Sequence, residues 1–396
     1  PVESRDELAR ALDMLLSGSD NFEEVLDRAR RFANDHKFQV GMQIIKCMLD
    51  ADQSASALTD LAEVEIEALY GRVKKEFEAR HGRVGDQDLA VVALGKLGGR
   101  EITENSDLDL LFVYGDPAPG ADTGGTSDGP KPLAPTQYFA RFSQQLITAL
   151  SAPTAEGLLY EVDMRLRPSG NAGPISSSLS AFTQYQESQA WTWEHMALTR
   201  ARVIAGPEAL AGKINEAVAE ILTSPRDGEK LKAEVCHMRR RIADAHPPTS
   251  PWDVKYLAGG LVDVEFIAQY LQLKHAHEDA SVLDTNTNRA LDKLAEAGLL
   301  QPEVAKMLGT AGKLWRTIQG MLRFTVEGPF DEEAATVGLK DALVRAAESE
   351  DFDALKRTME ETAEEVRAAF KDLIGDPDTA AALQSSKDDN EGGKTP

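Results

Sequence analysis

Apolar residues recur every three or four positions through the first 88 residues, a spacing typical of helices. Between residues 58 and 77 the apolar positions step by four or three, while glutamates and lysines occupy the other faces. This is the pattern of one long amphipathic helix. We therefore expect residues 1–88 to form a helical region.

After residue 88 the pattern changes to short apolar runs. The runs at 89–94 and 108–114 are bounded by glycine or proline and predict two strands, and a third strand is predicted at 158–164. Residues 115–135 are rich in proline and glycine and predict a mobile loop. Helical spacing resumes at 137–150. Strands separated by helices over so short a stretch predict a small mixed α/β unit.

Helical spacing replaces the strand signals after about residue 180. It covers residues 180–205, 226–245, 259–277, 286–325 and 353–374. The sequence thus predicts an α+β fold that is predominantly helical. We expect four segments: residues 1–88, a sheet-containing domain at 89–205, a helical bundle at 206–375 and a disordered tail at 376–396.

Composition narrows the classes of function. The 396 residues carry a formal net charge of −23, from 43 Lys and Arg against 66 Asp and Glu, which disfavours a broad nucleic-acid-binding surface. No run approaches the roughly 18 apolar residues of a membrane span. The two cysteines, Cys47 and Cys236, are far apart, which excludes a disulfide framework and favours a cytoplasmic protein.

A glycine-rich turn, Gly95–Arg100, follows the first predicted strand. Glycines allow a tight turn and let backbone N–H groups approach a phosphate. The spacing is neither that of a P-loop nor that of a dinucleotide-binding motif. A plain structural turn is therefore the alternative interpretation.

Carboxylates open the second predicted strand and end the third. Because side chains alternate along a strand, Asp107 and Asp109 should share one face while Leu108 and Leu110 pack inward. Paired carboxylates favour a hard cation such as Mg²⁺, although a solvated strand face gives the same alternation. Asp163 would supply the third carboxylate that two-metal phosphoryl transfer requires.

Two arginines follow Asp163. Arg165 and Arg167 offer paired N–H donors that suit phosphate oxygens. The alternative is that they form structural ion pairs with the acidic strand.

Taken together, these motifs resemble the nucleotidyltransferase fold of the DNA polymerase β superfamily. The longer runs at 95–101, 106–110, 160–170 and 259–266 are similar to those of bacterial glutamine synthetase adenylyltransferase, and the resemblance covers about residues 85–375. The run at 187–202 is similar to the C-terminal, AMP-adding half of that family. The resemblance implies that residues 1–88 are the linker between the two halves and that an AMP-removing domain lies upstream.

The resemblance also implies a mechanism and partners. It assigns Asp107, Asp109 and Asp163 as catalytic, Mg²⁺-binding residues, and ATP and glutamine synthetase as substrates, with the PII signalling protein and glutamine as candidate regulators. The nucleotide-binding residues it implies are Gly95, Lys96, Gly98, Gly99, Ser106, Arg165 and Arg167. Two alternatives remain open: phosphorolytic removal of AMP from glutamine synthetase, and a non-catalytic helical module that binds PII or glutamine.

We also make predictions for a pair of tryptophans and for a run of three arginines. Trp191 and Trp193 are predicted to pack in a core, with adenine stacking as the alternative. The run Arg239–Arg241 is a candidate docking patch for an acidic partner, with a solvated helix face as the alternative.

Overall fold

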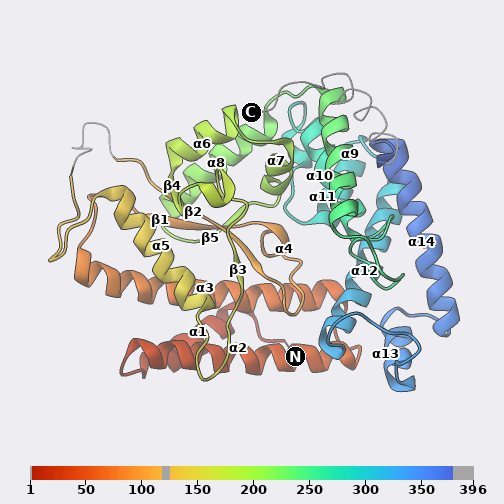
Figure 1. Cartoon of the computed structure of the whole chain (residues 1–396), viewed down its shortest axis with the longest axis horizontal. Helices are drawn as coiled ribbons and strands as arrows, with labels where there is room; N and C mark the ends of the chain where they lie inside the picture. The colour runs from red at the N-terminus through yellow and green to blue at the C-terminus, as the bar shows by residue number, and fades with distance from the viewer. Residues whose placement is uncertain (1, 118–124, 378–396) are drawn as a thin grey trace, which may run out of the picture. The chain divides into compact units, whose positions relative to one another are not determined.

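A computed structural model describes residues 2–117 and 125–377. The chain divides into two compact units: Pro1–Ala190 with Arg200–Ile221 form unit 1, and Trp191–Thr199 with Leu222–Pro396 form unit 2. Both units are rich in helix and unit 1 holds a small mixed sheet (Figure 1), which confirms the predicted α+β, predominantly helical class. The domain boundaries at 88, 205 and 375 stay predictions.

Three helices begin unit 1: α1 (Arg5–Ser17), α2 (Phe22–Ile45) and α3 (Ala51–His81). Each is preceded by a capping residue whose side-chain oxygen accepts a backbone N–H of the first turn, namely Ser4, Asn21 and Asp50. The amphipathic helix predicted between residues 58 and 77 lies within α3, and its apolar face is buried in the core of unit 1.

The sheet is centred on β1 (Leu89–Ala93) and β2 (Leu108–Tyr114), which pair antiparallel and confirm two predicted strands. The strand β5 (Arg202–Ala205) pairs antiparallel with β1. The short strands β3 (Val162–Asp163) and β4 (Ser176–Ser178) pair parallel with the beginning and the end of β2.

One face of the sheet packs on helices. Alternate β2 residues from Leu108 to Tyr114 join the core formed with α3 and α5 (Pro135–Ser151), the helix predicted at 137–150. Asp109 therefore lies on the opposite face. The one-turn helix α4 (Gly95–Gly98) contacts β1 and β2. Unit 1 also contains α6 (Leu179–Ser188) and the 3-10 turn η1 (Gly170–Ala172). Most of α8 (Glu208–Thr223) belongs to it as well.

The structure corrects the strand predictions at three places. The third strand spans residues 162–163 rather than 158–164, because Leu159 and Tyr160 are buried by packing and not by strand pairing. Strands continue beyond residue 180, since β5 falls inside a segment predicted to be helical. The serine-only strand β4 has no apolar residue to signal it.

Unit 2 is a helical assembly among the residues that the structure describes. The predicted segments at 226–245, 259–277 and 353–374 are confirmed as α9 (Gly228–Ala245), α10 (Leu261–His275) and α14 (Phe352–Leu373). The segment 286–325 forms two helices, α11 (Thr287–Glu296) and α12 (Pro302–Thr325), because Gly298 adopts a φ of +72° between them. The remaining elements are α7 (Thr192–Leu198), η2 (Ala280–Val282) and α13 (Val337–Ala346).

Two predicted irregular segments fall largely or partly outside this description. Residues 118–124 of the loop predicted at 115–135 and residues 378–396 of the predicted tail lie outside the described residues. Within the described ranges, no helix has both the length and the apolar character needed to cross a membrane.

Candidate active site

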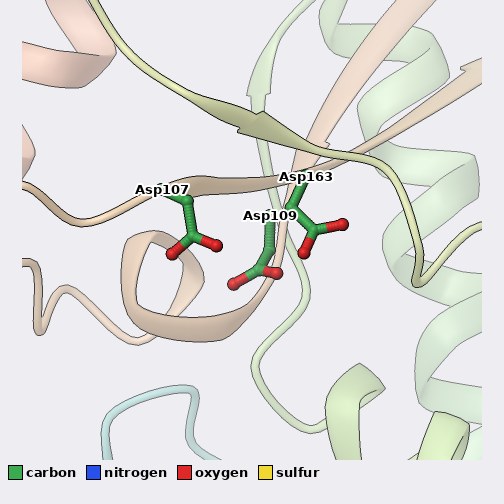
Figure 2. Close-up of side chains that lie close together, drawn as sticks. All are labelled: Asp107, Asp109 and Asp163. Carbon is green, nitrogen blue, oxygen red and sulfur yellow. The ribbon is translucent and has the colours of Figure 1, made fainter.

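Three carboxylates meet on the sheet face of unit 1 that is opposite its helical core. Asp109 in β2 pairs in register with Asp163 in the parallel strand β3, and Asp107 immediately precedes β2. Each of the three offers a carboxylate oxygen within 4.8 Å of those of the other two. Figure 2 shows the three side chains extending to the same side of the two strands. The predicted convergence of these residues is therefore present in the structure.

Alternation along β2 sets the direction of two of the carboxylates. Leu108 and Leu110 are both fully buried in the core, whereas Asp107 is exposed and Asp109 half-buried. A polar pair is tolerated here because this end of the face is accessible to solvent, whereas Leu111 and Val113 farther along the same face are buried.

Gly95 lies against the carboxylate of Asp109. Its φ is +51°, and a Cβ at this position would come within 2.0 Å of Asp109 Oδ2. The backbone N–H of Leu94 also donates to the carbonyl of Asp109 at 2.9 Å. The start of the predicted glycine turn is therefore shaped to hold one of the three carboxylates.

The other two glycines of the turn serve its packing. A Cβ on Gly98 would lie 1.9 Å from the carbonyl oxygen of Arg200. The N–H groups of Gly98 and Gly99 donate to the carbonyls of Leu94 and Gly95, so both amides are used inside the turn. This arrangement favours the structural interpretation of Gly98 and Gly99 over the predicted contacts with phosphate.

Lys96 and Ser106 meet at Thr103. The Lys96 ammonium donates to Thr103 Oγ1 at 3.3 Å, and Ser106 Oγ lies 3.1 Å from the same hydroxyl and accepts the backbone N–H of Thr103 at 3.2 Å. These bonds shape the connection that leads into Asp107. The nucleotide-binding roles of Lys96 and Ser106 stay predictions.

Arg165 is bound to the third carboxylate. Its backbone N–H donates to Asp163 Oδ1 at 2.8 Å and its Nε donates to Oδ2 at 2.7 Å, while its side chain stays 74% exposed. Partial burial acts to raise the pKa of Asp163, but the Arg165 hydrogen bonds and the charges of Arg165 and Arg167 outweigh it and hold that pKa below its ordinary value. Asp163 is therefore ionised at neutral pH.

The Arg167 side chain forms hydrogen bonds with residues of the loop that contains it. Its Nη1 donates to the carbonyl of Met164 at 2.8 Å and to Asn171 Oδ1 at 3.4 Å. Arg165 thus forms the ion pair expected from the structural alternative, whereas these bonds of Arg167 are to uncharged groups; the contacts of both arginines with phosphate stay predictions.

The donor set fits a hard divalent cation. Three carboxylates provide oxygen ligands, which Mg²⁺ prefers. Their mutual repulsion is relieved by a cation between them, and Arg165 shares its charge with all three through space, since Asp163, Asp107 and Asp109 all act to raise its pKa. Asp107, Asp109 and Asp163 are thus the residues that would hold Mg²⁺.

Sequence reasoning missed the residues that support α4. Arg202 in β5 donates to the carbonyls of Leu97 and Gly98 at 2.9 and 3.1 Å and pairs with Glu63 of α3 at 2.5 Å. Glu63 also pairs with Arg100 at 3.3 Å. These groups come from three distant parts of the chain, so no local pattern could have joined them.

Two predictions outside the carboxylate cluster are wrong in part, the first at Trp191 and the second at Arg239. Trp191 is 69% exposed and does not pack in a core. Arg239 is buried and forms an ion pair with Asp263, so it is not part of a surface docking patch.

A small mixed sheet with three carboxylates on the face opposite its helical core is the site expected of a nucleotidyltransferase domain. The comparisons with known proteins agree with this class. The family model described as glutamate-ammonia ligase adenylyltransferase matches residues 1–217, and the chain belongs to that family. A second model, described as PII-uridylyltransferase, matches residues 229–374.

The curated relatives carry the same family name. Proteins named bifunctional glutamine synthetase adenylyltransferase/adenylyl-removing enzyme are 44% identical over 94% of this chain in Rhodopseudomonas palustris strain TIE-1, 42% over 96% in Bradyrhizobium diazoefficiens and 43% over 93% in Xanthobacter autotrophicus. The chain spans 37 to 38% of the length of these relatives.

Proposed function

We propose that this chain transfers AMP from ATP to a tyrosine hydroxyl of glutamine synthetase and releases pyrophosphate. The observation that carries the proposal is the meeting of Asp107, Asp109 and Asp163 from two neighbouring strands. The names of the relatives supply the acceptor protein, and the tyrosine comes from the resemblance of the 187–202 run to the AMP-adding half of the family.

In this reaction the phenolic oxygen loses its proton to solvent and forms a bond to the α-phosphorus of ATP, and the bond from that phosphorus to the bridging oxygen of pyrophosphate breaks. A free phenol has a pKa of about 10 and is a weak nucleophile at neutral pH. When bound, Mg²⁺ supplies charge neutralisation on the phosphates and lowers the pKa of a coordinated hydroxyl. Asp107 and Asp109 hold the nucleotide side of the site, and Asp163 completes it on the acceptor side.

The rigid parts of the site prepare it for this reaction. Buried Leu108 and Leu110 hold the Asp107–Asp109 pair, and Gly95 leaves the space that the Asp109 carboxylate needs. Arg165 keeps Asp163 ionised. Asp163 is therefore in its ligand form before substrate arrives, and the positions of the other two carboxylates are set by the strand, which removes a reorganisation cost from the reaction.

The competing function is phosphorolytic removal of AMP, because the relatives are named for both activities and this chain spans only part of their length. The same carboxylates would serve that reaction. PII and glutamine as regulators, and a cytoplasmic location, belong to the same proposal and come from family resemblance and cysteine usage.

We expect Asp107→Asn and Asp163→Asn each to lower AMP transfer by on the order of a hundredfold or more, because each removes charge from the metal site. Asp86→Asn, an exposed aspartate in the connection before β1, serves as the matched control and should keep parent activity. The measurement is the mass increase of glutamine synthetase by one AMP after incubation with the chain, ATP and Mg²⁺.

The reverse assay separates the two candidate activities. The chain is incubated with adenylylated glutamine synthetase and phosphate, and loss of AMP is followed by mass. Transfer without removal supports the proposal, whereas removal without transfer replaces it. Full transfer activity in Asp163→Asn would exclude the three-carboxylate site.

A further inference from the structure

The strand that carries Asp163 has very little strand pairing to hold it. The strand β3 contains two residues, and its registered partners in β2 are Leu108 and Asp109. One more backbone bond, from Leu108 N–H to the Glu161 carbonyl at 2.8 Å, lies at its start. A ladder this short fixes a chain weakly, so other contacts must set the position of Asp163.

Part of this support comes from helices α2 and α3, whose side chains form hydrogen bonds to residues within the segment 149–160. Arg30 of α2 is fully buried and donates to the carbonyls of Ala149 and Gly157 at 3.1 and 3.0 Å. Lys37 of α2 donates to the Leu159 carbonyl at 3.1 Å, and its ammonium lies 4.1 Å from the centre of the Tyr160 ring. Two cations on one helix thus bind the backbone that leads into β3.

The deepest of these contacts is a buried carboxyl. Tyr160 O–H donates to Glu65 Oε2 of α3 at 2.8 Å, and both side chains are buried. Burial raises the pKa of Glu65 to about 8, so this acid is mainly neutral at neutral pH. Burying a carboxyl is costly, and the proposed reaction does not use Glu65. Its hydrogen bond holds Tyr160, three residues before Asp163.

We propose that Glu65 and Tyr160, together with Arg30 and Lys37, are positioning residues that set Asp163 at ligand distance from Asp109. The proposal rests on the proposed function to the extent that Asp163 is taken as a metal ligand. It extends that function by making the helical region before the sheet part of the metal site.

The test is a Mn²⁺ titration of the full chain, followed by the electron paramagnetic resonance of free Mn²⁺, without nucleotide or acceptor. Tyr160→Phe and Lys37→Met should each raise the dissociation constant for Mn²⁺ about tenfold, the usual effect of removing an outer-shell support. Glu65→Gln keeps an acceptor for Tyr160 and should bind Mn²⁺ within about twofold of the parent, which a loss of the hydrogen bond would not allow.

Tyr70→Phe is the matched control. Tyr70 also lies on α3 and its buried hydroxyl donates to a backbone carbonyl, that of Leu89, at 2.7 Å. Its loss should lower thermal stability about as much as Tyr160→Phe but leave the Mn²⁺ dissociation constant unchanged. An equal weakening of Mn²⁺ binding in both variants would overturn the proposal, because a general loss of stability would then explain it.

Asp163→Asn distinguishes a failure of the positioning role from a failure of the proposed metal site. If it weakens Mn²⁺ binding while Tyr160→Phe and Lys37→Met bind Mn²⁺ as the parent does, the positioning role is wrong and the metal site stands. If Asp163→Asn also binds Mn²⁺ as the parent does, both the metal site and the positioning role are wrong.

Discussion

Gly95 is required by the carboxylate beside it as well as by its own backbone. Its φ of +51° favours glycine over other residues, and the Asp109 carboxylate fills the space that a Cβ would take. Gly85 has nearly the same φ, +53°, but a Cβ there would meet nothing within 4 Å. Substituting Gly85 therefore tests the backbone cost alone, whereas substituting Gly95 adds a clash with Asp109.

We expect Gly95→Ala and Gly85→Ala to share a backbone cost of about 1–2 kcal/mol in the free energy of unfolding. Gly95→Ala should also abolish the proposed AMP transfer, because Asp109 must move. Urea denaturation and the AMP-transfer assay test both variants. Transfer at the parent rate in Gly95→Ala would show that Asp109 does not need its observed place.

Glu65 makes unit 1 sensitive to pH. Its pKa is about 8 in the folded chain against an ordinary value of 4.5, so the folded state binds this proton more tightly. The free energy of unfolding should therefore fall as pH rises from about 4.5 to about 8, by up to about 1.4 kcal/mol per pH unit. Glu65→Gln carries no such proton.

The stability of Glu65→Gln relative to the parent should thus increase steadily from pH 5 to pH 8. Urea denaturation at pH 5, 6.5 and 8 measures this difference. A difference that stays constant with pH would mean that Glu65 is ionised in the folded chain.

At the scale of elements, the buried pair Arg239–Asp263 joins α9 to α10. Asp263 also accepts the backbone N–H of Gly259, and Arg239 donates to the carbonyls of Tyr256 and Leu257 at 3.1 and 3.2 Å. The basic run on α9 therefore contains one structural arginine. Its neighbour Arg240 pairs with Asp244 on the same helix at 3.0 Å, and Asp244 is largely exposed.

Asp263→Ala should lower the free energy of unfolding by about 3–5 kcal/mol, because it leaves Arg239 buried without its ion-pair partner. Asp244→Ala removes an exposed pair on the same helix and should cost no more than about 0.5 kcal/mol. Urea denaturation measures both. Equal small effects would show that Arg239 reaches water in the absence of Asp263.

At the scale of the whole molecule, a unit is not a continuous stretch of sequence. The short helix α7 belongs to unit 2, where it contacts α9 and α10, although the chain returns to unit 1 directly after it. Met196 on α7 is buried. All four tryptophans, Trp191, Trp193, Trp252 and Trp315, lie within unit 2, so their fluorescence reports on that unit.

Met196→Ala should therefore lower the free energy of unfolding measured by tryptophan fluorescence by about 2–5 kcal/mol, the range for truncating a buried methionine side chain to alanine. Met14→Ala, at a methionine that is 73% exposed on α1, is the control and should leave this transition unchanged. An unchanged transition in Met196→Ala would show that α7 contributes little to unit 2.

Local pattern was sufficient for much of this protein. The spacing of apolar residues correctly predicted α3, β1, β2 and most helices of unit 2. An amphipathic helix and a half-buried strand each require apolar residues at a fixed period, and that period is visible in the sequence. Alternation also placed Asp107 and Asp109 on one face. Its place at the end of the third predicted strand, together with the family motifs, also located Asp163, but not the contacts that hold it.

Tertiary structure decided what depends on partners far away in the chain. It shortened β3, brought β5 beside β1, buried Arg239 against Asp263 and set Glu65 against Tyr160. Each outcome depends on which polar groups become hydrogen-bond or ion-pair partners when the elements pack. Burying a polar group without a partner is costly, so these pairings decide which arrangement is stable. The sequence by itself determined most of the helices, the two central strands and the choice of the three carboxylates, and packing set the short strand that brings Asp163 beside the other two.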